Sequence, residues 1–521
     1  TEATLTNDYW YPMIARGPAT YSARIAVPKG WTIIAQGEPG AASQTSATFR
    51  MSLPVVYFSL TAGPFKSYRQ EIKGKEYRVW SQSLTTEQMR WQTELNAPVV
   101  EFYEKAFGKY PFSGWGSLVS PHYGGGALEA YSYATYGEGW LPDEDSHEPA
   151  HTWWGGIVKN SYLRSLWNES FATYSGELYS REGPVGNVAE KRLAFVIEGT
   201  PDDSYNAAPV ADGGPGIGPA AASLGYGKGA QVLQMLEDEI GTGQMVASMR
   251  SWAATAPQDR ISNWEDFERV VGDTTRNDLR WFFDQWLRRP GWPKIKLESA
   301  TWADGQVNAT FAWDGPKYQL GMDVMLEYDD GTRVFDRVRI GPTPDSDKSF
   351  AAIASPRKPV LISFDPWRKV LRNRTADETP VQLSQFVGRA RYYVDPARPD
   401  WMSQWRGRPN LALTKLPEDL NGTLVIGSPE TLPAMKALCA KAGFAVSGNK
   451  LTYDGATIDL RDGAALAVVE LGGGRRVAIA LGKTRLGPRF GRARLALTDG
   501  LGRFLRGSTE PKTSGSLTAR L

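Results

Sequence analysis

The three histidines of the chain, His122, His147 and His151, all lie between residues 122 and 151. His147 and His151 are four positions apart and flank Glu148 in the stretch SHEPAHTWWGG. On a helix, residues four apart lie on the same face, so both imidazoles can reach one cation. Zinc prefers such ligands, and a neighbouring glutamate can act as base toward a zinc-bound water. The spacing therefore predicts a hydrolytic zinc centre with His147 and His151 as ligands and Glu148 as base.

Pro149 lies inside this motif, where a running helix would lose a hydrogen bond of its ladder. The first turn of a helix has unpaired N–H groups, and serine is a common helix cap. We therefore expect the helix to begin at Asp145 or Ser146, with Pro149 in its first turn and Ser146 as cap.

The third zinc ligand is expected from a second helix. Glu169 opens the amphipathic segment that follows His151 and can face back toward the first helix. For His122 we expect a loop or surface position rather than a ligand role. Trp153 and Trp154 are expected to pack in the interior rather than to contact substrate.

Changes in hydrophobic periodicity predict a multidomain α+β fold. Alternating apolar residues indicate an N-terminal β domain, a mainly helical catalytic domain follows, and alternation returns in a β-sandwich with turns at Asp304-Gly305 and Asp330-Gly331. A polar, proline-bearing linker leads to a small α/β domain and a tail without regular structure. The predicted ranges, in this order, are 1–84, 85–291, 292–367, 368–409, 410–506 and 507–521.

The composition excludes several classes of protein. The 59 Lys and Arg residues nearly balance the 57 Asp and Glu residues, so no strong field favours nucleic acid or an anionic membrane surface. No apolar run approaches the length of a membrane span, so we expect none in this chain. Cys439 is the one cysteine, which excludes an internal disulfide.

Longer stretches resemble a known family. HEPAHTWWG, the later frame NESFA around Glu169, YGGGALEAYSYATYG and LGYGKGAQVLQML are similar to motifs of the gluzincin aminopeptidases of the aminopeptidase N type, which have thermolysin-like catalytic domains. The resemblance covers roughly residues 9–367. Seventeen residues separate His151 from Glu169, one fewer than is usual in the family, and Gly176 stands where the family has an acidic residue that orients a ligand histidine.

This resemblance implies the roles of further residues. Glu129 would bind the free α-amine of the substrate, and the backbone of Gly125, Gly126 and Ala127 would hydrogen-bond the peptide. Tyr226 would stabilise the oxyanion. The second amine-binding group normally comes from the N-terminal domain, where Glu2, Asp8 and Gln36 are candidates.

The resulting prediction is a zinc aminopeptidase with one Zn²⁺ per chain that acts on peptides with a free N terminus. Two alternatives remain: a catalytically impaired binding scaffold, suggested by the short spacing and Gly176, and an endopeptidase of the same fold. Relatives in the family that the chain resembles often combine a WYP-like stretch with an extracytoplasmic location, so YWYP at residues 9–12 implies an extracytoplasmic over a cytoplasmic location.

Overall fold

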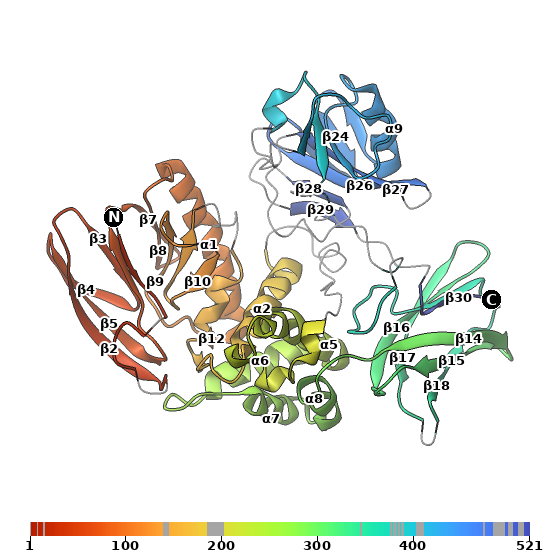
Figure 1. Cartoon of the computed structure of the whole chain (residues 1–521), viewed down its shortest axis with the longest axis horizontal. Coiled ribbons are helices and arrows are strands. Elements are labelled where there is room, and N and C mark those ends of the chain that lie inside the picture. The colour runs from red at the N-terminus through yellow and green to blue at the C-terminus, as the bar shows by residue number, and fades with distance from the viewer. Residues whose placement is uncertain are drawn as a thin grey trace.

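The computed structural model describes residues 2–521 except positions 8, 14–15, 125, 139–144, 185–202, 344–345, 376–377, 379–382, 384–385, 387–389, 403–410, 473–474, 483–494, 499–503 and 509–514. Figure 1 shows N-terminal sheets, a helical region, a two-sheet region and a C-terminal α/β region that stands above the helices in this view. The multidomain α+β architecture predicted from the sequence is confirmed.

The N-terminal region contains two small antiparallel sheets, with strand orders β1-β6-β3 and β2-β5-β4. Their side chains alternate between buried and exposed, so that Phe49 and Met51 of one strand face the interior while Arg50 faces solvent. The strands are β1 (Ala3–Leu5), β2 (Ala19–Ala26), β3 (Thr32–Ala35), β4 (Glu38–Ala42), β5 (Ser46–Val55) and β6 (Leu60–Gly63).

A five-stranded sheet of order β10-β11-β9-β8-β7 follows, with helix α1 (Thr86–Phe107) packed on β7 and β8. Thr85 and Gln88 form a capping box at the start of α1. Two strands of this sheet precede residue 84, so the sheet crosses the boundary predicted from the sequence. The strands are β7 (Lys66–Ile72), β8 (Lys75–Ser81), β9 (Gly114–Ser120), β10 (Ala127–Glu129) and β11 (Tyr133–Gly137).

The helical region is built around aromatic side chains. Phe171 of α2 lies 5.0 Å from Trp252 and 4.8 Å from Phe267, measured between ring centroids, and all three are buried. Trp153 and Trp154 are also fully buried, as predicted. The elements are β12 (Trp154–Gly155), β13 (Val158–Lys159), α2 (Trp167–Glu182), α4 (Ala220–Ala222), α5 (Ala230–Ile240), α6 (Thr242–Thr255), α7 (Trp264–Thr275), α8 (Arg280–Leu287), and the 3₁₀ turns η2 (Asp203–Asn206), η3 (Val210–Asp212) and η4 (Pro215–Ile217).

The predicted β-sandwich consists of sheets β14-β15-β18 and β17-β16-β19-β30. The hairpin at Asp304-Gly305 has positive φ at both residues, as its turn type requires. The strands are β14 (Ile295–Ala303), β15 (Gln306–Trp313), β16 (Leu320–Glu327), β17 (Arg333–Ile340), β18 (Lys348–Ala354), β19 (Leu361–Phe364) and β30 (Thr518–Arg520).

Strand β30 corrects the predicted tail. It pairs antiparallel with β19, Leu517 beside it is fully buried, and the N–H of Phe364 donates to the carbonyl of Leu517 at 3.0 Å. The polar composition of 507–521 hid this strand, because only Leu517 and Leu521 supply large apolar side chains. The sandwich is therefore completed by residues that follow the α/β domain in the chain.

The C-terminal α/β domain has its own hydrophobic core and a seven-stranded mixed sheet of order β21-β20-β22-β27-β26-β28-β29. Strand β20 lies inside the predicted linker, so the range 368–409 is only partly a linker. The elements are β20 (Arg391–Val394), η7 (Pro399–Met402), β21 (Ala412–Leu413), β22 (Thr423–Ile426), α9 (Pro433–Ala442), β23 (Ala445–Ser447), β24 (Lys450–Tyr453), β25 (Ala456–Asp459), β26 (Ala464–Gly472), β27 (Arg475–Gly482), β28 (Leu495–Thr498) and β29 (Phe504–Ser508).

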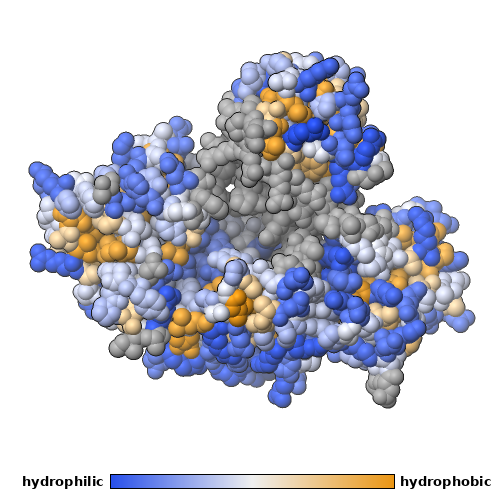
Figure 2. All heavy atoms as spheres, viewed as in Figure 1, coloured by the Kyte–Doolittle hydropathy of each residue, from blue (hydrophilic) through white to orange (hydrophobic). Residues whose placement is uncertain are grey.

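Hydrophilic residues cover most of the face seen in Figure 2, with hydrophobic patches over the N-terminal strands, the sandwich and part of the helical region. Among the helices that the structure describes, none is both long and apolar enough to cross a membrane.

Candidate metal centre

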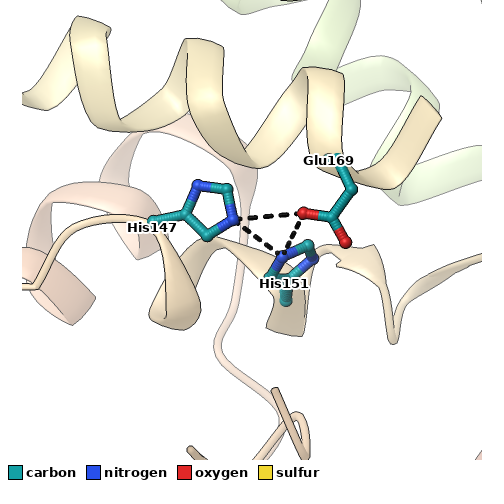
Figure 3. A group of neighbouring side chains, drawn as sticks. All are labelled: His147, His151 and Glu169. Atoms are coloured by element: carbon teal, nitrogen blue, oxygen red, sulfur yellow. Dashed lines mark hydrogen bonds and ion pairs between the residues drawn. The ribbon is translucent and has the colours of Figure 1, made fainter. Parts of the chain in front are cut away.

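Three side chains converge between the HEPAH stretch and helix α2 (Figure 3). Oε2 of Glu169 lies 3.2 Å from Nε2 of His147 and 3.3 Å from Nε2 of His151, and the two imidazole nitrogens are 3.2 Å apart. His151 and Glu169 are buried, while His147 is partly exposed. The three predicted ligands therefore point their donor atoms at one small region.

The HEPAH stretch is a short 3₁₀ helix, η1 (Glu148–Thr152), rather than the expected α-helix. It starts at Glu148 with His147 at the N-cap position, and Asp145 rather than Ser146 accepts the N–H groups at this end. Oδ1 of Asp145 accepts the N–H groups of His147 at 2.8 Å and of Glu148 at 3.2 Å. The carboxylate cap satisfies these N–H groups, and Pro149 follows at the second helical position, where no ladder bond is lost.

Three successive turns, each wider than a turn of α-helix, follow η1. The N–H groups of Gly156, Ile157 and Val158 each donate to a carbonyl five residues earlier, at 3.1, 2.8 and 2.8 Å. This path brings the carbonyl of Trp154 to 3.0 Å from Nδ1 of His151. The carbonyl can only accept, so Nδ1 carries the proton and Nε2 is left as a donor of its lone pair to a metal.

Glu169 lies in the first turn of α2, and its other oxygen is held by the neighbouring residue. Nδ2 of Asn168 donates to Oε1 of Glu169 at 3.0 Å, which leaves Oε2 facing the imidazoles. The charges and hydrogen bonds of His147 and His151 outweigh burial and lower the pKa of Glu169. The shorter spacing between His151 and Glu169 thus still brings the third ligand to the histidines.

Gly176 lies seven residues after Glu169 in helix α2, where it faces Ser146. A Cβ atom there would be 3.3 Å from Oγ of Ser146, next to His147 in the chain. In the described part of the chain, Nδ1 of His147 has no hydrogen-bond partner, whereas Nδ1 of His151 has one. The expected loss of support at Gly176 therefore concerns His147.

Glu148 is buried, and its Oε2 has no hydrogen-bond partner among the described residues. Burial, followed by the negative charge of Asp145, raises the pKa of Glu148 well above its usual value. An orphaned buried carboxylate oxygen is costly unless a ligand or substrate completes it. A base with a raised pKa is suited to accept a proton near neutral pH.

Glu129 lies at the end of β10, the edge strand of the five-stranded sheet. Its carboxylate is within 4.8 Å of the donor atoms of Glu148 and His151, and burial raises its pKa. Ala127 is the first residue of the same strand, and Gly126 precedes it. The carbonyl of Gly126 accepts the N–H of Gly137 at 3.0 Å. Gly125 lies outside the described residues.

Tyr226 stacks on His147, with ring centroids 5.7 Å apart and planes 18° apart. It lies in η5 (Ser223–Gly229), a turn of π-helix. Although the residue is 46% exposed, burial of its hydroxyl end and the charge of Glu169 raise its pKa, so the phenol stays protonated. The predicted oxyanion donor is therefore a surface residue of the centre and not a core tyrosine.

Close packing of η5 on α2 positions Tyr226. Oγ of Ser170 donates to the carbonyl of Gly225 at 2.8 Å. A Cβ atom on Gly225 would lie 2.8 Å from Cβ of Leu166, and one on Gly229 would lie 2.0 Å from Oγ of Ser170. Only glycine fits at these two contacts, which explains the GYGKG pattern in physical terms.

The remaining candidates are His122 and the three amine-binding candidates of the N-terminal region, Glu2, Asp8 and Gln36. His122 is in a turn after β9, as expected, and is not part of either group of potential metal ligands among the described residues. Glu2 binds Ser120 and Gln82, while Oε1 of Gln36 accepts the N–H of Ser59 at 2.7 Å. Asp8 lies outside the described residues.

The donor set fits a divalent metal. Three carboxylates, those of Glu129, Glu148 and Glu169, surround His151. Burial alone would lower the pKa of His151, but the charges of Glu129 and Glu169 outweigh it and raise the pKa. This surplus of negative charge and the N, N, O donor set are those of a zinc or similar cation site.

Residues 91–286 match the family model described as Peptidase family M1 domain. The predicted resemblance to zinc aminopeptidases of the aminopeptidase N type is thereby confirmed, and the matched segment contains the candidate ligands, Glu148 and Tyr226.

Two curated aminopeptidases are similar to about half of this chain. The chain is 24% identical over 305 residues to aminopeptidase N of Haemonchus contortus, covering 50% of this chain and 31% of that protein. It is 26% identical over 279 residues to leucyl aminopeptidase of Saccharolobus solfataricus, covering 48% of this chain and 34% of the relative. The chain thus matches about a third of the length of these curated relatives.

The fold is similar to that in the crystal structure of Legionella pneumophila aminopeptidase A in complex with aspartic acid. The TM-score is 0.57 at 14% identity, covering 70% of this chain and 46% of that one. At this identity the likeness concerns the fold alone.

Proposed function

We propose that this protein is a zinc-dependent aminopeptidase that removes N-terminal residues from peptides, with one Zn²⁺ per chain. The observation that carries the proposal is the convergence of His147, His151 and Glu169, whose donor atoms lie 3.2 to 3.3 Å from one another. The match of residues 91–286 to the M1 domain family model supports it.

His147, His151 and Glu169 would hold the zinc ion, which when bound polarises the scissile carbonyl and lowers the pKa of water. Glu148 accepts the proton of the attacking water, because its free Oε2 and raised pKa suit a general base. The same carboxyl then delivers the proton to the leaving amine. Tyr226 donates a hydrogen bond to the oxygen on which negative charge develops.

Glu129 pairs with the N-terminal ammonium of the substrate and so limits cleavage to the first residue. The residue is 4% exposed, so an acylated N terminus would leave its buried carboxylate without a positive charge to pair with. Strand β10 lies at the sheet edge, where Gly126 and Ala127 can align the peptide backbone as an added strand.

Glu148→Gln tests the catalytic proposal. We expect the variant to keep about one zinc per chain, measured by plasma mass spectrometry, and to hydrolyse an aminoacyl-anilide about 10²- to 10⁴-fold more slowly, the usual contribution of a general base. Zinc-free protein without turnover would instead favour the binding-scaffold alternative, and unchanged turnover in the variant would remove Glu148 from the mechanism. Equal cleavage of free and N-acetylated peptides would favour an endopeptidase.

We also propose an extracytoplasmic location, supported by the YWYP start at residues 9–12. Fractionation of cells that express the natural gene, with antibody detection, tests it. Recovery in the cytoplasm would contradict it.

A further inference from the structure

The carboxylate of Glu129 is held by a residue outside the metal centre. The hydroxyl of Tyr162 donates to its Oε1 at 2.6 Å, and both residues are buried. We propose that Tyr162 is a positioning residue that fixes the Glu129 carboxylate and thereby sets selectivity for a free N terminus. This inference rests on the proposed function for the amine-binding role of Glu129.

The backbone of Tyr162 is held in an uncommon conformation. Its φ is 62°, in the left-handed region that bulky residues rarely adopt. Oδ1 of Asn160 accepts the N–H of Tyr162 at 2.9 Å, and Nδ2 of Asn160 donates to the carbonyl of Ser165 at 3.1 Å. Strained residues persist where surrounding contacts determine them, and they are enriched at functional sites. Here the strain directs the phenol at Glu129.

Two further tyrosines enclose this contact. Tyr57 of the N-terminal region donates to the backbone carbonyl of Glu129 at 2.7 Å, and the hydroxyls of Tyr131 and Tyr162 are 3.0 Å apart. The ring of Tyr57 lies 5.2 Å from that of Tyr131 and 5.9 Å from that of Tyr162. A Cβ on Gly155 would lie 3.0 Å from the Tyr162 hydroxyl, so this glycine leaves room for it. Glu129 is thus held at both its backbone and its side chain.

The same contacts connect the amine anchor to a metal ligand. Asn160 accepts the N–H of Tyr162 with its Oδ1 and donates from its Nδ2 to Oδ1 of Asn168 at 2.6 Å. Asn168 in turn donates to Glu169 at 3.0 Å. Asn160 and Asn168 are 2% and 0% exposed. A buried, connected network of this kind keeps two groups at a fixed separation. The separation between the ammonium site and the zinc determines which peptide bond is cleaved.

Tyr162→Phe removes the hydroxyl and keeps the ring. The test uses zinc-loaded full-length protein that carries Glu148→Gln, and measures by calorimetry the affinities for leucinamide and N-acetyl-leucinamide. In the parent we expect tighter binding of the free amine. In Tyr162→Phe we expect the affinity ratio of free to acetylated amide to fall about tenfold, the lower end for a hydrogen bond to a charged group.

Tyr174→Phe is the matched control, because it removes a buried hydroxyl that also donates to a carboxylate, Oε2 of Glu237 at 3.0 Å, and that contacts neither Glu129 nor Tyr162. It should keep the ratio within about twofold, with zinc content and melting temperature equal in the two variants. With Glu148 restored, Tyr162→Phe should raise KM for an aminoacyl-anilide about tenfold and change kcat by less than about threefold.

An unchanged ratio in Tyr162→Phe, an equal loss in Tyr174→Phe, or a parent that binds both amides equally would overturn the inference. Protein with glutamate at 148 that hydrolyses no anilide would contradict the proposed function instead. The binding ratio would still decide the role of Tyr162 in that case.

Discussion

Gly229 lies where η5 crosses α2, and its replacement by alanine tests whether this crossing positions Tyr226. A Cβ at residue 229 would lie 2.0 Å from Oγ and 2.9 Å from Cβ of Ser170, whereas ordinary contacts begin near 3.4 Å. Ser170 is fully buried and cannot turn into solvent. The turn that bears Tyr226 must therefore move by about 1.4 Å, the difference between 3.4 and 2.0 Å.

A displacement of about 1 Å in a catalytic group can cost on the order of 100-fold in rate. We therefore expect Gly229→Ala to lower kcat for an aminoacyl-anilide about 100-fold and the free energy of unfolding by about 1 to 3 kcal/mol. Zinc affinity, measured by chelator competition, should change little, because His147, His151 and Glu169 all lie outside η5.

The double variant Gly229→Ala/Ser170→Gly removes the clashing side chain and should recover most of the lost kcat, relative to Ser170→Gly alone as control. A single variant with the kcat of the natural protein, or a double variant without recovery, would refute the reasoning that this contact positions Tyr226.

Two further predictions concern the oxyanion donor and an interdomain carboxylate. Tyr226→Phe should lower kcat about 10²- to 10³-fold while zinc content stays near one per chain, and unchanged kcat would remove Tyr226 from the mechanism. Asp238 lies 3.7 Å from Lys369, and burial raises the pKa of Asp238 to about 6. The folded state therefore binds this proton more tightly than the unfolded state does, and this contribution to the free energy of unfolding is lost as pH rises from about 4 to 6. Asp238→Asn should therefore raise the free energy of unfolding by about 1 to 3 kcal/mol at pH 7.5 and by much less at pH 4, measured by urea unfolding, and an equal effect at both pH values would contradict the assignment.

The convergence of His147, His151 and Glu169 could be predicted from the sequence because it depends on local spacing and residue type. Two histidines and a glutamate within five positions constrain one another, and Glu169 follows in a recognisable frame. The local backbone could not be predicted to the same degree. An α-helix was expected where a 3₁₀ helix capped by Asp145 is found, because the difference depends on the wide turns that follow Thr152 and on contacts with distant tyrosines.

Residues that act through distant contacts gave no signal in the sequence. Tyr57, Tyr131 and Tyr162 are separated from one another by 31 to 105 positions, and a single sequence does not mark which of its 22 tyrosines meet. The π-helical turn that presents Tyr226 likewise requires the surface of α2 as a partner. The same reason applies to β30, whose pairing strand lies more than 150 positions earlier.

The pairing of β30 with β19 makes the α/β domain an insertion in the sandwich, tethered at both of its ends. Because chains are synthesised from the N terminus, the sandwich lacks its fourth strand in the sheet β17-β16-β19-β30 until the whole α/β domain has left the ribosome. During that interval β19 is an open sheet edge, which is a site for wrong pairing between chains. Folding of the α/β domain therefore determines when β30 can pair with β19 and how far β30 must move to reach it.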